Sequence, residues 1–171
     1  DAPIIPVSAQ QGINIDKVKE LLVEQKVPDR DLDSSPEFLV ARSFDVNKPG
    51  TPIEKLKGGV LAGILKKGRL RVGDVIEIKP GISEKQANQM VYKPIKTKIV
   101  SIFRGSHKIS QATPGGSLAF ETELDNILTK TDSLSGCLAS TPGDLPDISY
   151  TLKVKHVLFI EVLGEEKKTV I

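Results

Sequence analysis

The segment from residue 38 to residue 139 constrains the fold most, because it is built from short apolar stretches with no helical pattern between them. Each stretch is bounded by Gly, Pro, Asn or Asp, which favour turns. The expected strands are 38–46, 59–65, 70–79, 94–103, 117–122 and 135–139. A run of short strands of this kind is typical of a sandwich or a barrel. We predict a mainly β fold with a closed barrel.

Alternation along residues 70–79 predicts which side chains face the core. The apolar side chains expected to point inward are Leu70, Val72, Ile76 and Ile78. The charged side chains expected to face solvent are Arg69, Arg71, Glu77 and Lys79. The following segment, 81–92, is polar enough to predict an exposed insertion between two strands.

The N-terminal part of the chain has a different pattern. A short apolar strand at residues 4–7 is followed by a turn and by a helix for which Asn14 is the expected N-cap. The apolar positions Ile15, Val18, Leu21 and Leu22 recur at helical spacing until Pro28 ends the run. One strand and one helix cannot enclose a core, and such a strand usually lies inside a parallel sheet. We therefore expect the end of an α/β domain whose neighbours are outside this chain.

Two segments rich in Pro and polar residues divide the chain. The first is 28–36 and the second is 141–146, after which the alternating run 150–160 starts another unit. We expect residues 1–35 to be the remnant and linker, 36–145 the barrel, and 146–171 the truncated start of a third domain. The chain begins with Asp1 instead of Met, which we interpret as a piece of a longer protein.

Composition excludes several classes of protein. No apolar run approaches the roughly 20 residues that span a bilayer, so we expect no membrane partner. Cys137 is the only cysteine, which fits a reducing cytoplasm, and we expect it to be a small buried residue. The formal charge of +2 is too small to indicate a nucleic-acid partner by itself.

The motifs of catalysis are missing. Gly58 and Gly63 have the spacing of a phosphate-binding loop, but Ile64 and Leu65 follow where Lys and a hydroxyl are required. Residues 47–50, Asn-Lys-Pro-Gly, lack the Asp that would bind a guanine base. The two histidines, His107 and His156, have no ligand spacing. We predict a binding module without catalytic residues, cofactor or metal of its own.

Several motifs carry a resemblance to one family. They are RSFDVNKPG at 42–50, LKGGV at 56–60, KGRLRVGDVIEIKPG at 67–81, KPI at 93–95, KIVSIF at 98–103 and ATPGGSL at 112–118. Together they closely resemble the gamma subunit of eukaryotic and archaeal translation initiation factor 2, over essentially the whole chain. RSFDVNKPG is the most specific motif, whereas KGRLRVGDVIEI is shared in outline with elongation factor Tu and the selenocysteine elongation factor.

This resemblance implies an elongation-factor-Tu-like second-domain β-barrel. It would be preceded by the terminal strand and helix of an α/β GTPase domain and followed by the first strands of a third-domain β-barrel. GTP and magnesium would be cofactors of the full-length parent only. Ser8, Ala9 and Gln10 are similar to the last guanine-contacting element of such a domain, although a simple turn explains them equally. We expect no useful GTP affinity in this chain.

The resemblance also implies a function. The family delivers methionyl initiator tRNA to the small ribosomal subunit in a GTP-dependent complex with alpha and beta subunits, in the cytoplasm. The implied tRNA-binding candidates are Gly59, Val60, Gly63, Arg104, Gly105, His107 and Lys108. Basic side chains neutralise phosphates, and glycine lets RNA approach the main chain. The same glycines could instead relieve crowding in a bent strand, and the basic residues could be solvated loop charges.

Docking of the alpha subunit is the second implied role. The candidates are Asn47, Lys48 and Lys57 in the loop 47–57, together with the insertion 82–92, because both segments are long and exposed. Two alternatives remain open: the second domain of another translational GTPase, such as the selenocysteine elongation factor, and a barrel used only for protein docking. RSFDVNKPG favours the initiation factor.

Overall fold

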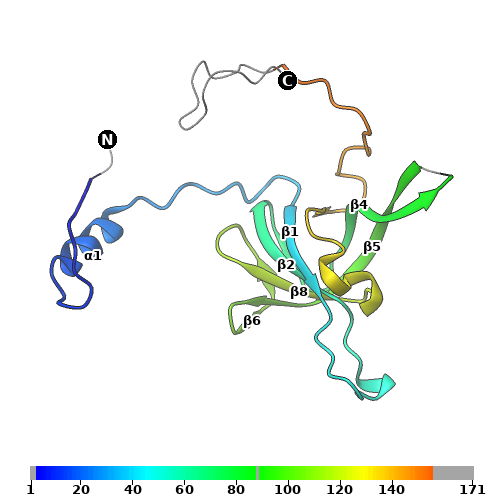
Figure 1. Ribbon diagram of the computed structural model, residues 1–171, viewed down its shortest axis with the longest axis horizontal. Helices are drawn as coiled ribbons and strands as arrows, with labels where there is room; N and C mark the ends of the chain where they lie inside the picture. The colour runs from blue at the N-terminus through cyan, green and yellow to red at the C-terminus, as the bar shows by residue number, and fades with distance from the viewer. Residues whose placement is uncertain (1–2, 88, 156–171) are drawn as a thin grey trace, which may run out of the picture.

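The computed structural model describes residues 3–87 and 89–155. Its elements, in chain order, are α1 (Ile15–Glu24), β1 (Glu37–Phe44), η1 (Ile53–Lys55), β2 (Val60–Lys67), β3 (Leu70–Arg71), β4 (Val75–Gln86), β5 (Gln89–Arg104), β6 (His107–Ile109), β7 (Gln111–Ala112), β8 (Leu118–Thr122), η2 (Asn126–Asp132) and β9 (Leu138–Ser140). Figure 1 shows the strands gathered in one body and α1 apart from it, joined by an extended segment.

Six of the described strands close a barrel. They pair in the order β4-β9-β1-β2-β8-β5, and β5 pairs with β4 to complete the ring. β6 pairs with the C-terminal end of β5, along the edge opposite β8. β3 and β7 form a separate short pair. Closure leaves few unpaired strand edges, which is how small antiparallel sheets avoid exposed backbone groups. The predicted mainly β class and the closed barrel are confirmed.

The core lies inside this ring. Phe38 of β1 and Phe120 of β8 are fully buried and stack with ring centroids 4.3 Å apart. Aliphatic side chains from the other strands, such as Leu61 and Ile78, surround this pair. Cys137 is buried as expected, and burial raises the pKa of its thiol. The thiol is therefore protonated and behaves as a small apolar side chain.

The alternation predicted for residues 70–79 is broken by a turn. Gly73 has φ +95°, and residues 72–74 separate β3 from β4. Val72 is consequently 41% exposed, so its predicted inward orientation is wrong, whereas Leu70, Ile76 and Ile78 are buried. Residue count along a strand predicts the facing side only while the strand is continuous.

Glu77 was also expected at the surface and is only 8% exposed. Its carboxylate lies 3.9 Å from Lys79 Nζ and 3.8 Å from Lys96 Nζ, and it accepts a hydrogen bond of 3.2 Å from the Gly143 amide. The segment after β9 covers this side of β4, which the sequence of β4 alone does not reveal. A buried carboxylate needs such partners, and here two lysines and an amide supply them.

In the polar segment 81–92, residues 83–87, 89 and 90 are exposed as predicted, whereas Gly81 is buried, and the segment forms regular strands. It extends β4 and β5 into a two-stranded ribbon that projects from the barrel, with pairs such as Ser83 with Tyr92. Tyr92 lies against Tyr150, with ring centroids 6.2 Å apart. The chain that leaves the barrel therefore contacts this ribbon at Tyr150.

The N-terminal helix forms where predicted, but two details differ. Residues 4–7 make no strand, because strands that could pair with them are absent from the described chain. Asn14 has φ +58° and does not cap α1 through its side chain; its Nδ2 donates to Pro6 O at 2.8 Å. The left-handed backbone, which Asn tolerates, turns the chain into the helix instead.

The C-terminal expectation is only partly covered by the structure. Of the run 150–160, residues 150–155 have no strand assignment and 156–160 lie outside the described residues. The division of the chain at residues 35 and 145 stays a prediction. Within residues 3–87 and 89–155, no helix combines the length and apolar character that crossing a membrane requires.

Candidate binding surfaces of the barrel

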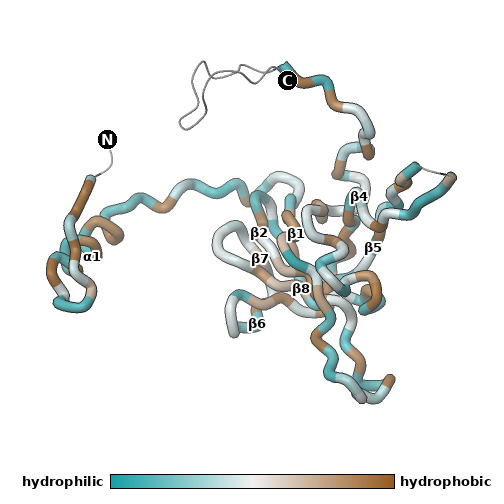
Figure 2. The backbone as a smooth tube through the Cα atoms, viewed as in Figure 1, coloured by the Kyte–Doolittle hydropathy of each residue, from teal (hydrophilic) through white to brown (hydrophobic). Residues whose placement is uncertain are grey.

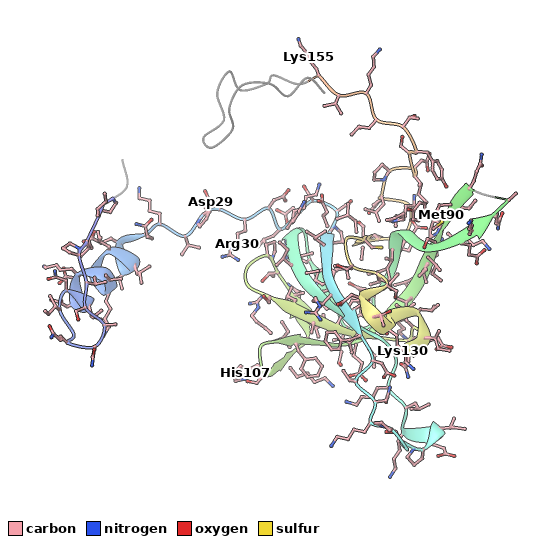
Figure 3. The ribbon with its side chains drawn as sticks, in the orientation of Figure 1. Asp29, Arg30, Met90, His107, Lys130 and Lys155 are labelled. Atoms are coloured by element: carbon pink, nitrogen blue, oxygen red, sulfur yellow. The ribbon has the colours of Figure 1, made fainter. Side chains whose placement is uncertain are left out.

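The first candidate surface is the tip of the β5–β6 hairpin. The sequence predicts a strand that ends at residue 103, and the structure folds the residues that follow as a tight hairpin in which Arg104 pairs with His107. Gly105 has φ +60°, which lets the turn close in two residues. Arg104, His107 and Lys108 are all exposed, and Figure 3 shows His107 at the far end of the hairpin. The tip thus presents three basic side chains on a short, ordered turn.

Arg104 has a structural contact as well as exposure. Its Nη2 donates to the carbonyl of Thr113 at 2.9 Å and lies 3.4 Å from Thr113 Oγ1. The guanidinium has further N–H donors that these contacts leave open. Among the described residues, neither His107 nor Lys108 has an ion-pair partner. Lys108 is therefore the cation at this tip with the fewest competing contacts.

The candidates before and within β2 are buried. A Cβ on Gly59 would lie 2.3 Å from Thr129 Cγ2, and one on Gly63 would lie 1.9 Å from the Leu39 carbonyl oxygen. Val60 is only 7% exposed. The glycines thus permit close contact of β2 with η2 and β1, and β8 separates β2 from β5 in the sheet. The structure does not bring Gly59, Val60 and Gly63 together with the hairpin tip on one surface.

The second candidate surface is the long loop between β1 and β2. The Asn47 side chain bridges its two arms: Nδ2 donates to the Lys57 carbonyl at 2.7 Å, and Oδ1 accepts from the Lys57 amide at 2.8 Å. Asn47 also donates from its backbone N–H to Asp45 Oδ1 at 2.8 Å. Hydrogen bonds from the backbone and then the side chain of Asn47 lower the pKa of Asp45. Asn47 therefore holds the shape of the loop.

The tip of this loop exposes apolar side chains that sequence reasoning missed. Ile53 in η1 is 83% exposed, and Leu56 follows it at 46%. Lys48 is exposed at the start of the loop, and Lys57 Nζ lies 4.0 Å from a Glu121 carboxylate oxygen. The sequence did contain a signal for this apolar tip, because Ile53 and Leu56 are apolar residues in an otherwise polar loop. The loop combines an apolar tip with basic flanks, an arrangement suited to a protein partner.

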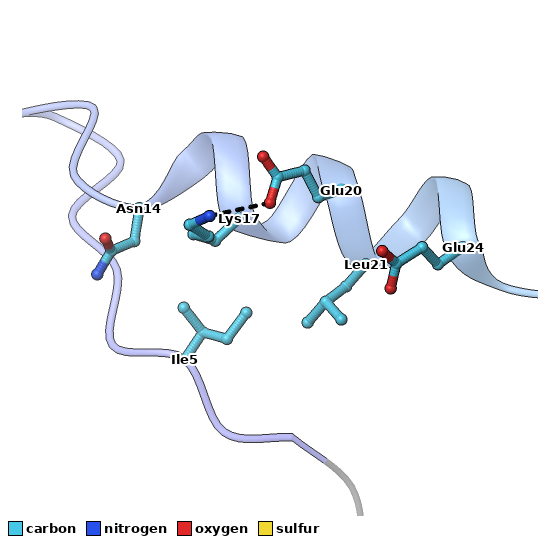
Figure 4. Close-up of a pocket in the computed structure, with 6 residues that line it drawn as sticks. All are labelled: Ile5, Asn14, Lys17, Glu20, Leu21 and Glu24. Carbon is cyan, nitrogen blue, oxygen red and sulfur yellow. Dashed lines mark hydrogen bonds and ion pairs between the residues drawn. The ribbon is translucent and has the colours of Figure 1, made fainter.

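The third candidate is the turn at residues 8–10. The Ser8 and Ile13 backbones bond to each other at 3.2 and 3.1 Å, and Ser8 Oγ accepts from the Gln11 amide at 3.4 Å. Ala9 and Gln10 are exposed on this turn. Figure 4 shows the nearby open hollow, lined by Ile5, Asn14, Lys17, Glu20, Leu21 and Glu24. With two carboxylates and Lys17 already paired to Glu20 at 3.1 Å, this hollow is poorly suited to phosphate.

Within the part of the chain that the structure describes, no group of three or more His, Cys, Asp or Glu side chains could hold a metal ion. The hairpin tip and the β1–β2 loop consist mainly of cations, amides and apolar groups. Such groups can bind anions and protein surfaces, and they contain no nucleophile positioned beside a base.

The fold is similar to that of a solved translation elongation factor. The structure superposes on translation elongation factor SelB from Methanococcus maripaludis with a TM-score of 0.60, at 20% sequence identity, over 83% of this chain and 27% of that chain. At this identity the likeness shows the fold alone. No family model matches the sequence.

Curated relatives are much closer in sequence. Translation initiation factor 2 subunit gamma from Archaeoglobus fulgidus is 49% identical over 97% of this chain, the one from Methanococcus maripaludis is 47% identical over 100%, and the one from Pyrococcus furiosus is 45% identical over 98%. The chain spans 39%, 42% and 41% of these relatives. By sequence, and in agreement with its fold, the chain is therefore homologous to a part of translation initiation factor 2 subunit gamma.

Proposed function

We propose that the barrel is a recognition domain of a translation initiation factor, binding initiator methionyl-tRNA and a partner subunit. The whole factor would carry this tRNA to the small ribosomal subunit, in a GTP- and magnesium-dependent complex with alpha and beta subunits, in the cytoplasm. The relatives named translation initiation factor 2 subunit gamma support the process. The single observation that carries the tRNA role is the exposed basic tip formed by Arg104, His107 and Lys108.

The chemistry of this tip suits the end of an RNA chain. Arg104 and Lys108 can neutralise phosphates, and a guanidinium can bind two acceptor oxygens at once. Gly105 adds no side chain, so RNA can come close to the turn. Because Gly59, Val60 and Gly63 are buried, they would support the packing of β2 and would not contact the RNA directly.

The β1–β2 loop is the proposed docking site for the alpha subunit. Ile53 and Leu56 would enter an apolar pocket, while Lys48 and Lys57 would face acidic groups at its rim. Asn47 would act indirectly, by keeping the two arms of the loop together. Ser8, Ala9 and Gln10 would complete the guanine side of the nucleotide site only in the whole protein.

The tRNA role can be tested in the restored full-length factor with GTP bound. Lys108→Ala should weaken binding of charged initiator tRNA by a similar factor whatever the tRNA sequence. It should also reduce the slope of log affinity against log salt concentration by about 1, the contribution of one released counterion. Arg104→Ala should cost about 1–3 kcal/mol of tRNA binding, the scale of a charged hydrogen bond. Filter binding at two salt concentrations measures both effects, and GTP affinity should stay unchanged.

Lys66→Ala is a suitable control. Lys66 is a half-exposed lysine on β2, paired with Glu37 at 3.2 Å, and it lies outside the proposed site. Equal tRNA affinity of Lys108→Ala and the unchanged factor at both salts would remove the hairpin from the site. A barrel used only for protein docking would then be the better interpretation.

A further inference from the structure

Residues 30–36, here called the strap, lie against the barrel although their composition is that of a linker. The Asp31 carbonyl accepts a hydrogen bond of 2.8 Å from the Gly68 amide at the β2–β3 turn. Arg69 Nε donates to the Leu32 carbonyl at 2.9 Å, and the Arg69 guanidinium also pairs with Asp33. Two consecutive residues of one barrel turn thus bind three consecutive residues of the strap.

The strap is fitted closely at this turn. A Cβ on Gly68, which has φ +75°, would lie 2.5 Å from Pro36 Cα and 2.6 Å from the Ser34 carbonyl oxygen. The strap itself is folded, because Asp31 Oδ1 accepts from the amides of Asp33 and Ser34 at 3.1 and 3.0 Å. At its end, Ser140 Oγ of β9 donates to the Pro36 carbonyl at 2.5 Å.

A second anchor lies at the start of the strap. Arg30 donates from Nη1 to the Pro114 carbonyl, and a Cβ on Gly115 would lie 1.3 Å from that nitrogen. Glycine at 115 therefore leaves the space that the Arg30 guanidinium occupies. Arg104 donates to the neighbouring carbonyl of Thr113. The loop after β7 is thus held by an arginine of the strap and by an arginine of the β5–β6 hairpin.

The segment between α1 and the strap differs. Residues 25–29 are exposed, and their one described backbone hydrogen bond outside the helix runs from the Gln25 amide back to the Leu22 carbonyl, at 3.4 Å. No described bond joins these residues to the barrel. Figure 2 shows this stretch as a largely hydrophilic tube between the two bodies, and Figure 3 places Asp29 and Arg30 where it approaches the barrel.

We propose that the strap moves with the barrel and that the joint between the helical unit and the barrel lies at residues 25–29. Arg30 is then a positioning residue. It fixes the point at which the chain leaves the barrel toward α1, and it stabilises the loop to which Arg104 also donates a hydrogen bond. The joint lies N-terminal to the boundary expected at residue 35. Arg30 anchors the start of this seven-residue strap, Arg69 binds its middle, and the Ser140 hydroxyl holds its end, so the strap is an ordered part of the barrel.

Backbone 15N relaxation of the 171-residue chain tests this directly. The amides of residues 31–35 should have order parameters near those of β1, about 0.85, while residues 25–27 and 29 should fall below about 0.6. Arg30→Ala removes the side chain that donates to the Pro114 carbonyl and should lower the values of residues 30–32, 113, 115 and 116. Arg69→Ala should lower those of residues 31–34.

Glycine substitutions provide a matched pair. Gly115→Ala puts a methyl group in the Arg30 seat and should reproduce the Arg30→Ala pattern in the strap. Gly116→Ala strains the same loop at φ +72° but meets no atom within 4 Å, so it should leave the strap ordered. Strap order parameters as low as those of residues 25–29 in the unchanged chain would overturn the proposal. So would a strap that stays equally ordered in both Arg30→Ala and Arg69→Ala.

Discussion

The barrel and the N-terminal helix have equally clear apolar patterns but differ completely in burial. In the barrel, alternate residues of β1, β2 and β8 are buried, and Phe38, Leu61 and Phe120 are inaccessible to solvent. In α1, no residue is buried, and Leu22 is 67% exposed. The pattern determines which side of an element is apolar, whereas burial requires a second surface to cover that side.

The two regions also differ in how their backbone is stabilised. The ring includes pairings between strands far apart in sequence, such as β1 with β9 and β2 with β8, so the loss of one contact is resisted by the whole ring. A helix of ten residues has only its own hydrogen bonds and is shorter than the roughly 12–15 residues at which isolated helices become marginally stable. The helix is therefore the part of this chain that depends on atoms outside it.

The largest expected effect separates the two regions with the same substitution. Leu61→Ala removes a fully buried side chain from β2 and should reduce the free energy of unfolding by about 2–5 kcal/mol. Leu22→Ala, in the exposed face of α1, should change it by less than about 0.5 kcal/mol. Urea unfolding followed through a barrel signal measures both. Similar losses from the two variants would mean that α1 packs on the barrel.

A smaller effect concerns the ion pair that ties η2 to β1. Arg42 Nε donates to Asp132 at 2.9 Å, and the Ser43 amide donates to Asp132 Oδ1 at 3.0 Å. The Arg42 hydrogen bond, followed by that of Ser43, lowers the pKa of Asp132 below its usual value. A carboxyl with a lowered folded-state pKa contributes stability above its unfolded pKa, about 4, and loses it as the pH falls through the folded value.

Asp132→Asn is the corresponding variant, since Asn tolerates the φ of +56° at this position. At neutral pH it should be slightly less stable than the unchanged chain, and the difference should shrink as the pH falls below about 4. High salt should also shrink it, because the pair is solvent-exposed. Melting temperatures at pH 7 and pH 3 measure this. A difference that is constant with pH would assign the effect to packing rather than charge.

The amides of α1 should be much less protected from hydrogen exchange than those of the barrel strands. Amides of residues 18–24 should exchange with solvent at rates close to those of an unfolded peptide, while those of Leu61 and Phe120 should be strongly protected. Hydrogen exchange of the monomeric chain measures the contrast. Cooperative protection of α1 in a demonstrated monomer would show that this helix has found a covering surface within the chain.

Sequence reasoning was accurate where the structure is continuous and local. The strands at 38–46, 59–65 and 117–122 have the predicted positions within a few residues, because alternation and turn residues are both visible in the sequence. It failed at Val72 and Glu77. A turn at Gly73 restarted the alternation, and a distant segment carrying Gly143 covered the expected outer face of β4.

The candidate surfaces show the same limit. The exposure of Lys48, Arg104, His107 and Lys108 followed from polar character and turn signals. The exposed apolar tip at Ile53 was missed, because an apolar residue is expected inside unless the fold places it on a projecting loop. Gly59 and Gly63 serve close packing, which no sequence pattern distinguishes from close approach of a ligand.

The sequence by itself determined the fold class and the family resemblance, because period, turn residues and motif spacing are local properties. Only the tertiary structure decided that the linker-like residues 30–36 bind the barrel. The Arg30 and Arg69 anchors join residues 84 and 37 positions apart in the chain. Such pairs depend on how the ring closes, and closure is a property of all strands together.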